Sequence, residues 1–294
     1  VFGYTSMLIK LMSDAKPSHV AVAFDGPVKG TFRVDLYPEY KANRPPAPED
    51  LVPQFDLCRQ VTSAFRIPAL DDPRVEADDI IATLARQGSA AGYGVTIVSS
   101  DKDLMQLVDP NVVMWDTMRD TTFDEAAVTA KWGVAPTQLR DLLALMGDSS
   151  DNVPGVSGIG AKTAATLLQK HGDLEGVLAA APTIKGKRGK TLVEQADIAR
   201  LSARLVTLDE SVSLDVGLDD LAVSEPDLDQ VTELFGELDF DRMLQQVRVW
   251  AGADVGDDAP AEVAVQGLDR ELYETIDDEA RLDEILALVT ERGE

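Results

Sequence analysis

Three carboxylates begin one helical stretch of the sequence, Val75-Glu76-Ala77-Asp78-Asp79, which continues into an apolar helical pattern. A helix N-terminus favours negative charge, but the effect is modest. Three acids within four residues repel each other. We therefore expect cationic groups at this point of the fold.

Further acids follow the strands that the sequence predicts. Asp25 ends the apolar run 19–24, and Asp101 ends the apolar run 95–100. A third strand is predicted at 112–115. Helical patterns separate these strands, which predicts an α/β fold with a doubly wound, mostly parallel sheet. Active sites in such sheets lie beyond the carboxyl ends of the strands, so Asp25 and Asp101 are expected at one site.

Helices account for most of the remaining pattern, and strand signals nearly vanish after residue 136. We expect helices at 2–15, 48–67, 76–91, 102–108, 124–132, 138–146, 174–181, 193–207 and 227–247. Residues 251–267 have the composition of a linker. Beyond them the pattern predicts a strand at 271–276 and an amphipathic helix at 278–290.

The charge of the chain is uneven. The net charge is −25, but residues 209–294 carry −21 of it and residues 1–208 only −4. The low charge of the first part leaves nucleic acid open as a partner. No signal peptide or membrane-spanning run is visible. The single cysteine, Cys58, excludes an internal disulfide and fits a cytoplasmic location.

The acids together predict a site for hard divalent metals. Any one of them could instead be a helix cap, a turn residue or a solvated surface group. Their shared placement at strand ends and a helix start favours the metal site. The candidate ligands are Asp25, Glu76, Asp78, Asp79, Asp101, Asp103, Asp148 and Asp151. Two ions held there could activate a water for in-line attack on phosphorus.

A connection at residues 26–47 interleaves basic and aromatic side chains. Its spacing alone would fit a solvated loop. The functional interpretation is a gateway in which Lys41 and Arg44, one helical turn apart, meet a phosphate. Tyr40 could stack on a base. A metal phosphodiesterase needs such cations, because charge builds on the phosphate oxygens.

A glycine pattern precedes another predicted helix. Gly155, Gly158 and Gly160 are followed by Lys162 and Thr163. The glycines could simply serve turns and a close helix contact, since a glycine spacing alone is weak evidence. Backbone N–H groups at a helix start can also cradle a phosphate.

As a set, these motifs resemble the 5′-nuclease (5′→3′ exonuclease and flap endonuclease) domain of bacterial DNA polymerase I, over about residues 1–247. The matching motifs are residues 23–25, 40–45, 76–79, 100–103, 147–152 and 155–163, in the family's order. The resemblance implies a PIN-like 5′-nuclease fold followed by a helical, helix–hairpin–helix-type DNA-binding subdomain. It also implies a two-metal nuclease that uses Mg²⁺ or Mn²⁺ to remove 5′ flaps and RNA primers.

The resemblance also implies residue roles. The eight acids would surround the two ions, Lys41 and Arg44 would act on the scissile phosphate, and Tyr40 would stack near the displaced end. The loop 155–163 would grip duplex backbone, and in the family it often holds a K⁺ ion. One departure concerns the start of the chain: the family begins with a strand that carries a further metal-binding Asp, and this sequence begins after it.

The resemblance therefore implies an N-terminally truncated fragment of a DNA polymerase I chain. Its expected parts are a nuclease core at 1–147, a DNA-binding subdomain at 148–250, an acidic linker at 251–267 and the start of a 3′-5′ exonuclease-like domain at 268–294. The expected partner is DNA with 5′ flaps, nicks or RNA primers, bound by a monomer in the cytoplasm. Two alternatives stay open: a non-catalytic DNA-structure-binding module, and another metal phosphoesterase or phosphate-binding α/β protein.

Overall fold

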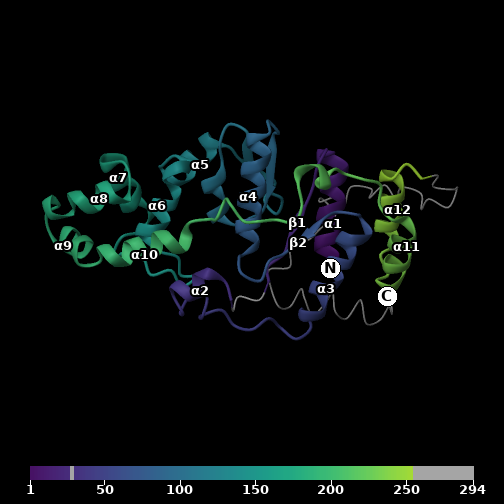
Figure 1. The fold of residues 1–294 in the computed structure, drawn as a ribbon, viewed down its shortest axis with the longest axis horizontal. Helices are drawn as coiled ribbons and strands as arrows, with labels where there is room; N and C mark the ends of the chain where they lie inside the picture. The colour runs from purple at the N-terminus through teal and green to yellow at the C-terminus, as the bar shows by residue number, and fades with distance from the viewer. Residues whose placement is uncertain (27–29, 254–294) are drawn as a thin grey trace, which may run out of the picture. The chain divides into compact units, whose positions relative to one another are not determined.

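A computed structural model describes residues 1–26 and 30–253 of the chain. The chain divides into two compact units, residues 1–252 and 253–294. The predicted domain at 268–294, and the predicted linker beyond Ala253, lie outside the described residues. Apart from Ala253, the described residues belong to the first unit (Figure 1).

The described strands form two small sheets rather than one. The first pairs β1 (Val22–Ala23) with β2 (Ala69–Leu70) in parallel. The second has the order β3 (Val95–Val98), β4 (Val112–Asp116) and β5 (Thr121–Phe123), with β3 and β4 parallel and β5 antiparallel. Strand and helix alternate as predicted. β2 and β5 escaped prediction because they are very short and show no alternation of apolar residues.

The predicted first strand is regular over only part of its length. Val20 donates its backbone N–H to Leu221, Val22 donates to Pro68, and Phe24 donates to Leu70. The segment therefore changes its pairing partner along its length, which leaves only Val22–Ala23 as β1. It still delivers Asp25 beyond the carboxyl end of the strand.

Helices make up the rest of the unit, close to the predicted positions. The amino-terminal half contains α1 (Phe2–Lys10), the π-helix η1 (Leu11–Ala15), α2 (Phe32–Leu36), α3 (Val52–Ala64), α4 (Ala77–Ala90), the 3₁₀ helix η2 (Lys102–Leu107) and α5 (Glu125–Trp132). The remainder contains α6 (Pro136–Met146), α7 (Ala161–His171), α8 (Leu174–Ala180), η3 (Ala181–Thr183), α9 (Lys187–Glu194), α10 (Ala196–Val206), η4 (Leu218–Leu221), α11 (Leu228–Glu237) and α12 (Asp241–Trp250).

Two predicted helices are each divided in the structure. The pattern at 193–207 breaks at Gln195, which separates α9 from α10. The pattern at 227–247 breaks near Asp239, whose φ of 55° lies in the left-handed region. Apolar periodicity continues across both breaks, so the sequence pattern alone did not reveal them.

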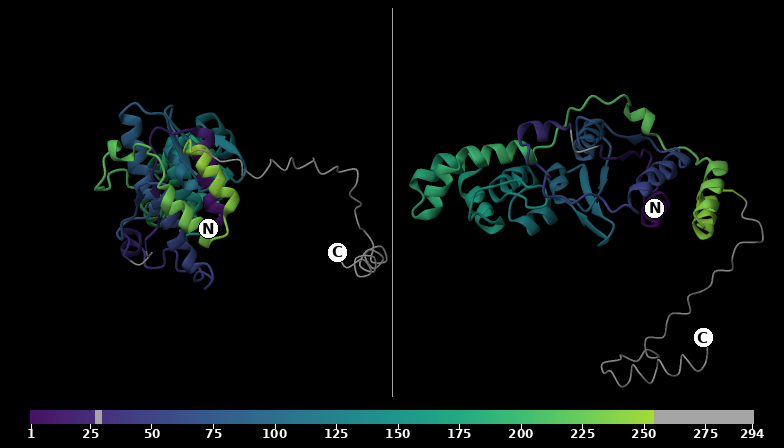
Figure 2. Two further views of the ribbon diagram at one scale, coloured as in Figure 1. Left: turned by 90° about the vertical axis from the view of Figure 1, so that its right-hand side faces the viewer. Right: turned by 90° about the horizontal axis from the view of Figure 1, so that it is seen from below.

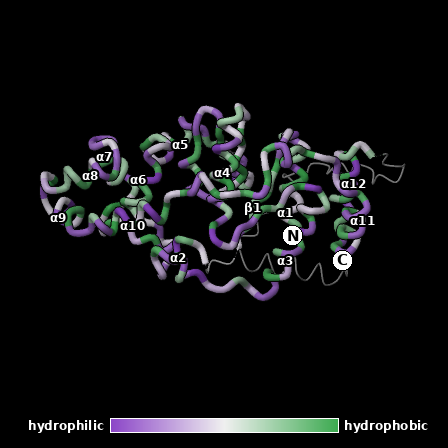
Figure 3. Tube along the Cα trace, viewed as in Figure 1, coloured by the Kyte–Doolittle hydropathy of each residue, from purple (hydrophilic) through white to green (hydrophobic). Residues whose placement is uncertain are grey.

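The buried side chains form two hydrophobic clusters. The larger runs from β3 and β4 through α6 to α7, α8 and α10, and it includes the fully buried Leu139, Leu142 and Leu143. α10 carries apolar residues along its length and packs against α6 (Figure 3). The predicted boundary at residue 147 falls inside this cluster, so the segments on either side share a core.

The smaller cluster joins the two ends of the first unit. Leu8 and Met12, near the start of the chain, pack with Phe65 of the α3 end and with Phe235 and Val247 of α11 and α12. Figure 2 shows α11 and α12 beside the N-terminal helix. Apolar packing thereby fastens the last described helices to the α/β part.

Two glycines let the chain pass closely over the end of α6. Gly155 has a φ of 60°, and a Cβ there would overlap the backbone of Gly147. Val156 then donates its N–H to Leu145, at 2.8 Å. This close passage places the loop after α6 against the helix end, and it explains why these two positions need glycine.

We predict that Gly155→Ala lowers the free energy of unfolding by about 2–5 kcal/mol, through left-handed strain and overlap with Gly147. The matched control is Gly158→Ala. Gly158 has a φ of 77°, but no heavy atom lies within 4 Å of the position that a Cβ would take, so only the conformational cost of about 1–2 kcal/mol applies. Urea unfolding of both variants measures the difference, and equal losses would contradict the close-passage argument.

Candidate active site

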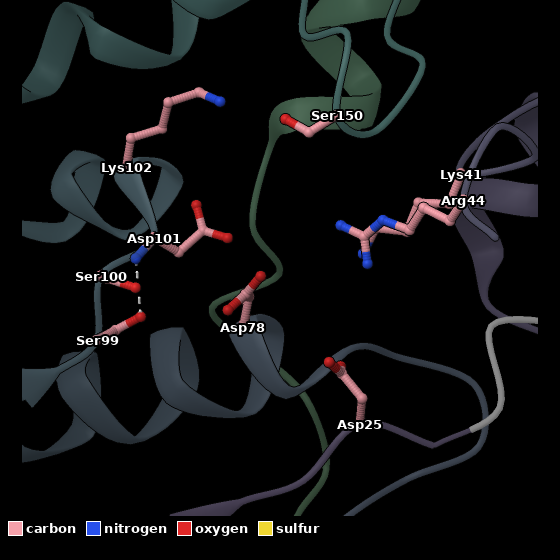
Figure 4. A pocket seen from close by; sticks show the side chains of 9 residues that line it. All are labelled: Asp25, Lys41, Arg44, Asp78, Ser99, Ser100, Asp101, Lys102 and Ser150. Carbon is pink, nitrogen blue, oxygen red and sulfur yellow. Dashed lines mark hydrogen bonds between the residues drawn. The ribbon is translucent and has the colours of Figure 1, made fainter. Parts of the chain in front are cut away.

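A cavity of about 500 Å³ lies where the carboxyl ends of β1 and β3 meet the start of α4 (Figure 4). Its lining consists of Asp25, Lys41, Arg44, Asp78, Ser99, Ser100, Asp101, Lys102 and Ser150. Acidic side chains from three separate segments thus converge, as their strand-end and helix-start positions predicted. Lys41 and Arg44, from one further segment, and Lys102, next to Asp101, supply cations at the same cavity.

Asp78 lines this cavity as a largely buried carboxylate. Burial, together with the charges of Asp101, Asp25 and Glu76, raises its pKa to about 7. Asp25 itself accepts a hydrogen bond from the Ala77 backbone N–H, at 2.9 Å, which ties it to the first turn of α4. Within the described residues, no hydrogen bond or ion pair reaches the Asp78 carboxylate.

Asp103 shows the same behaviour on η2. Burial, together with the charge of Asp101, raises its pKa to about 7. Its Oδ1 atom is buried and has no hydrogen-bond partner in the part of the chain that the structure describes. Asp101 caps the same helix by accepting the Asp103 N–H, at 2.9 Å. A buried, unpaired carboxylate oxygen is costly and calls for a cation or a proton.

These features fit hydrated divalent ions. Over residues 1–26 and 30–253, no three Asp, Glu, His or Cys side chains are arranged to hold a single ion between them. Mg²⁺, however, keeps several waters and takes only one or two carboxylates directly. A divalent ion would stabilise the charged forms of Asp78 and Asp103 and would give the unpaired Oδ1 of Asp103 a partner.

Three other predicted acids are already paired with cations. Glu76 accepts from Lys41 Nζ at 2.5 Å and from the Tyr40 hydroxyl at 3.0 Å. Asp151 accepts from Arg44 at 2.5 Å.

Asp148 is the third of these paired acids. It accepts from Lys102 Nζ at 2.6 Å and from Ser150. Burial alone would raise the pKa of Asp148, but the hydrogen bonds from Lys102 and Ser150 outweigh burial and lower it.

Asp79 faces away from the cavity. Its two oxygens accept from the Arg33 guanidinium at 2.6 and 2.7 Å, and also from the backbone N–H groups of Glu76 and Asp209. Asp79 is 0% exposed and Arg33 is 1% exposed. The predicted metal role of Asp79 therefore lacks support in its placement, because every direction around its carboxylate is occupied by a protein donor.

Arg33 in turn is fully engaged. Its Nε donates to the Leu205 carbonyl at 2.8 Å, and its Nη2 donates to the Thr207 carbonyl at 3.0 Å. The pair thus joins α2 and α4 to the end of α10. Sequence reasoning missed Arg33 as a site residue, since one arginine in a basic connection carries no signal of burial.

Tyr40 does not present its ring for stacking. It is 5% exposed, and its hydroxyl donates to Glu76 and Asp151. Burial and the charge of Glu76 strongly raise its pKa. The buried ring gives the predicted stacking of Tyr40 on a base no support in this conformation, while the neighbouring Lys41 lines the cavity.

The glycine loop, residues 155–160, lies apart from the cavity lining. Gly155 is buried, whereas Gly158 and Gly160 are exposed, and Gly160 precedes the first residue of α7. Lys162 is exposed in the first turn of that helix, and the Thr163 N–H bonds to the Gly160 carbonyl. The predicted exposed helix start is therefore present.

Comparison with known proteins decides the family. Residues 1–133 match the family model described as 5'-3' exonuclease, N-terminal resolvase-like domain, and residues 134–229 match its C-terminal SAM fold. A 5'-3' exonuclease of Aquifex aeolicus is 38% identical over 247 residues, with 84% of each chain covered. The chain belongs to the 5'-3' exonuclease family. This confirms the predicted PIN-like α/β fold followed by a helical subdomain.

Several relatives are much longer proteins. DNA polymerase I of Rhizobium leguminosarum is 47% identical over 274 residues, which cover 90% of this chain and 27% of the polymerase. DNA polymerase I of Geobacillus stearothermophilus is 39% identical over 296 residues, which cover 99% of this chain and 33% of the polymerase. The chain thus spans between a quarter and a third of these polymerases.

Solved structures share the fold at lower identity. T5 5'-exonuclease with bound zinc superposes with a TM-score of 0.62 and 22% identity, covering 85% of this chain and 90% of that one. The catalytic core of Rad2 in complex with DNA substrate superposes with a TM-score of 0.54 and 16% identity, covering 84% of this chain and 83% of that one. None of the helices in the described part of this chain is long and apolar enough to cross a membrane.

We predict that Arg33→Met lowers the free energy of unfolding by about 3–5 kcal/mol, because it leaves the Asp79 charge buried without a partner. Adding Asp79→Asn should recover part of the loss by removing that charge. The control is Arg74→Met, whose side chain is 77% exposed beside Asp72 and should change stability little. Urea unfolding measures all three, and an unchanged midpoint for Arg33→Met would contradict the assigned role of the pair.

We also predict a pH effect with a defined sign. The folded pKa values of Asp78 and Asp103 are about 7, raised from 3.8. The folded chain therefore holds more protons than the unfolded chain between these values, and these groups reduce stability as pH rises through 7. Divalent-ion affinity should rise over the same range, with about one proton released per carboxyl.

Titration calorimetry with Mn²⁺ at pH 6, 7 and 8 measures this pH effect, and Asp78→Asn should flatten the dependence. An affinity that does not change with pH in the unaltered chain would contradict it.

Proposed function

We propose that the chain is a metal-dependent 5′→3′ exonuclease and flap endonuclease that hydrolyses DNA and RNA phosphodiesters with two divalent ions. One observation carries the proposal: Asp78 faces Asp25 and Asp101 in the cavity with no hydrogen bond or ion pair to its carboxylate among the described residues, opposite Lys41 and Arg44. Membership of the 5'-3' exonuclease family supports it.

The proposed ligand set is narrower than the sequence suggested. Asp25, Asp78, Asp101 and Asp103 would hold Mg²⁺ or Mn²⁺, some of them through water. Glu76, Asp148 and Asp151, which already form ion pairs with lysine or arginine, would contact the ions less directly. Asp79 is not included, because it pairs with Arg33. The bound ions would supply an activated water and stabilise charge on the leaving oxygen.

The chain's own cations act on the phosphate. Lys41 and Arg44 line the cavity and are positioned by their ion pairs with Glu76 and Asp151. We infer that they donate to the oxygens of the scissile phosphate, where negative charge builds during in-line attack. Lys102, paired with Asp148, adds a third cation on the opposite side of the cavity.

The helical part would bind the duplex. The glycine loop and Lys162 offer backbone N–H groups and a positive charge at the start of α7, which suits sequence-independent phosphate binding. We also propose that residues 155–163 bind a K⁺ ion. We further propose that the chain divides into a nuclease core at 1–147 and a DNA-binding subdomain at 148–250.

The similarity to DNA polymerase I supports a proposal for the wider role. We infer that the chain is part of a DNA polymerase I and acts in primer removal and DNA repair, on DNA with 5′ flaps, nicks or RNA primers. We further propose that it acts in the cytoplasm as a monomer. Gel-filtration with light scattering tests the monomer directly.

We predict that Asp101→Asn reduces flap cleavage in Mg²⁺ at least about 100-fold, since it removes a charge that holds the ions. Binding of flapped duplex should persist. The control is Asp219→Asn, an exposed acid on η4 outside the cavity lining, which should cut at the unaltered rate. Unchanged turnover in Asp101→Asn would remove that acid from the ligand set.

A second function has one observation in its favour. Because no three acids are arranged around a single ion in the described part of the chain, a non-catalytic module that recognises DNA structure is the competing proposal. Tight binding of flapped duplex, with no cleavage in Mg²⁺ or Mn²⁺, would establish it. Failure to bind flapped duplex at low salt would instead favour a metal phosphoesterase that acts on a small substrate.

A further inference from the structure

One face of α10 holds the glycine loop by side-chain hydrogen bonds. Ser202 is fully buried, and its Oγ accepts the backbone N–H of Gly155, at 3.0 Å. Gln195 directly precedes the same helix. Its Oε1 accepts the Ser157 N–H at 2.8 Å, and its Nε2 bonds to the Ser157 hydroxyl at 3.1 Å.

The spacing of these two residues makes them act together. Gln195 and Ser202 are seven positions apart, which is about two helical turns, so both lie on one side of the helix. Ala199 lies between them on that side and is fully buried. α10 therefore reaches the loop at two points separated along its length, which fixes the orientation of the loop as well as its position.

These contacts leave the outer half of the loop free for a ligand. No acceptor among the described residues pairs with the N–H groups of Gly158, Gly160 or Lys162. No heavy atom lies within 4 Å of a Cβ built at Gly158 or Gly160. The two held N–H groups, at Gly155 and Ser157, thus face α10, while the unpaired ones stay accessible to a phosphate.

We propose that Ser202 and Gln195 are positioning residues for duplex binding, which hold the glycine loop so that its unpaired N–H groups meet a DNA phosphate. The inference rests on the proposed function, because it assigns to that function residues outside the loop itself. Neither residue touches the nucleic acid. Their effect is on the fraction of molecules whose loop is ready to bind.

The expected effect is on binding rather than on the chemical step. Ser202→Ala and Gln195→Ala should each raise KM for a 5′-flapped duplex roughly tenfold, which corresponds to a competent loop populated about a tenth of the time. The maximal rate at saturating substrate should stay within about twofold of the unaltered chain. The dissociation constant, measured by fluorescence anisotropy in EDTA, should rise in parallel with KM.

Two controls separate positioning from general damage. Arg200→Ala alters the same helix at an exposed residue that pairs with Glu175 and not with the loop, and it should leave KM unchanged. Ser202→Thr keeps the hydroxyl acceptor and should restore binding relative to Ser202→Ala. A purely structural role would lower the melting temperature and leave both KM and the dissociation constant unchanged.

Each outcome decides the inference. If Ser202→Ala fails to fold, Gln195→Ala decides alone, because Gln195 lies at the surface end of the helix. Unaltered KM in Gln195→Ala, or a fall in maximal rate with KM unchanged, overturns the positioning role. If the unaltered chain neither binds nor cuts flapped duplex, the proposed function fails and this inference falls with it. If the unaltered chain binds and the variants bind equally well, only the positioning role fails.

Discussion

The buried ion pair between Arg33 and Asp79 is the interaction on which the site depends. Burying two charges is unfavourable unless each is paired and its remaining hydrogen-bonding groups are satisfied. Here Asp79 accepts from two guanidinium nitrogens and two backbone N–H groups, and Arg33 also donates to the carbonyls of Leu205 and Thr207. The carbonyls belong to the end of α10 and the residue after it, so the pair fixes the α/β part against the helical part.

The pair also determines which acid faces the cavity. Neighbouring residues on a helix point about 100° apart, so fixing Asp79 toward Arg33 turns Asp78 toward Asp25 and Asp101. Glu76, before the first turn, meets Lys41 and Tyr40. The three acids of one stretch therefore have three environments: a buried ion pair, a charge-neutralised cap and an open cavity. Ion pairs with Arg33 and Lys41 offset the charges of Asp79 and Glu76, whereas the charge of Asp78 has no ion-pair partner among the described residues.

These three environments explain what the sequence could and could not predict. Strand ends and helix starts follow from apolar periodicity, so the convergence of Asp25, Asp78 and Asp101 was predictable from pattern alone. The partner of Asp79 lies 46 residues away on α2, and no local pattern records such a pairing. Tyr40 was expected to face a base because aromatic residues suit stacking, whereas its burial depends on packing against distant segments. Residue type predicted chemistry well, and the direction of side chains poorly.

The raised and lowered pKa values separate the acids that the protein's own cations neutralise from those that they do not. Asp148 has a lysine and a serine beside it, and its pKa is lowered. Asp78 and Asp103 make no hydrogen bond or ion pair with a cation among the described residues. Burial and neighbouring acids outweigh the charges of Lys41 and Lys102 and raise both pKa values, at the cost of folded-state stability above neutral pH. A fold gains nothing in its own stability from two such carboxylates. An external cation bound between them would offset this cost, and the proposed metal-dependent phosphodiesterase would supply such a cation.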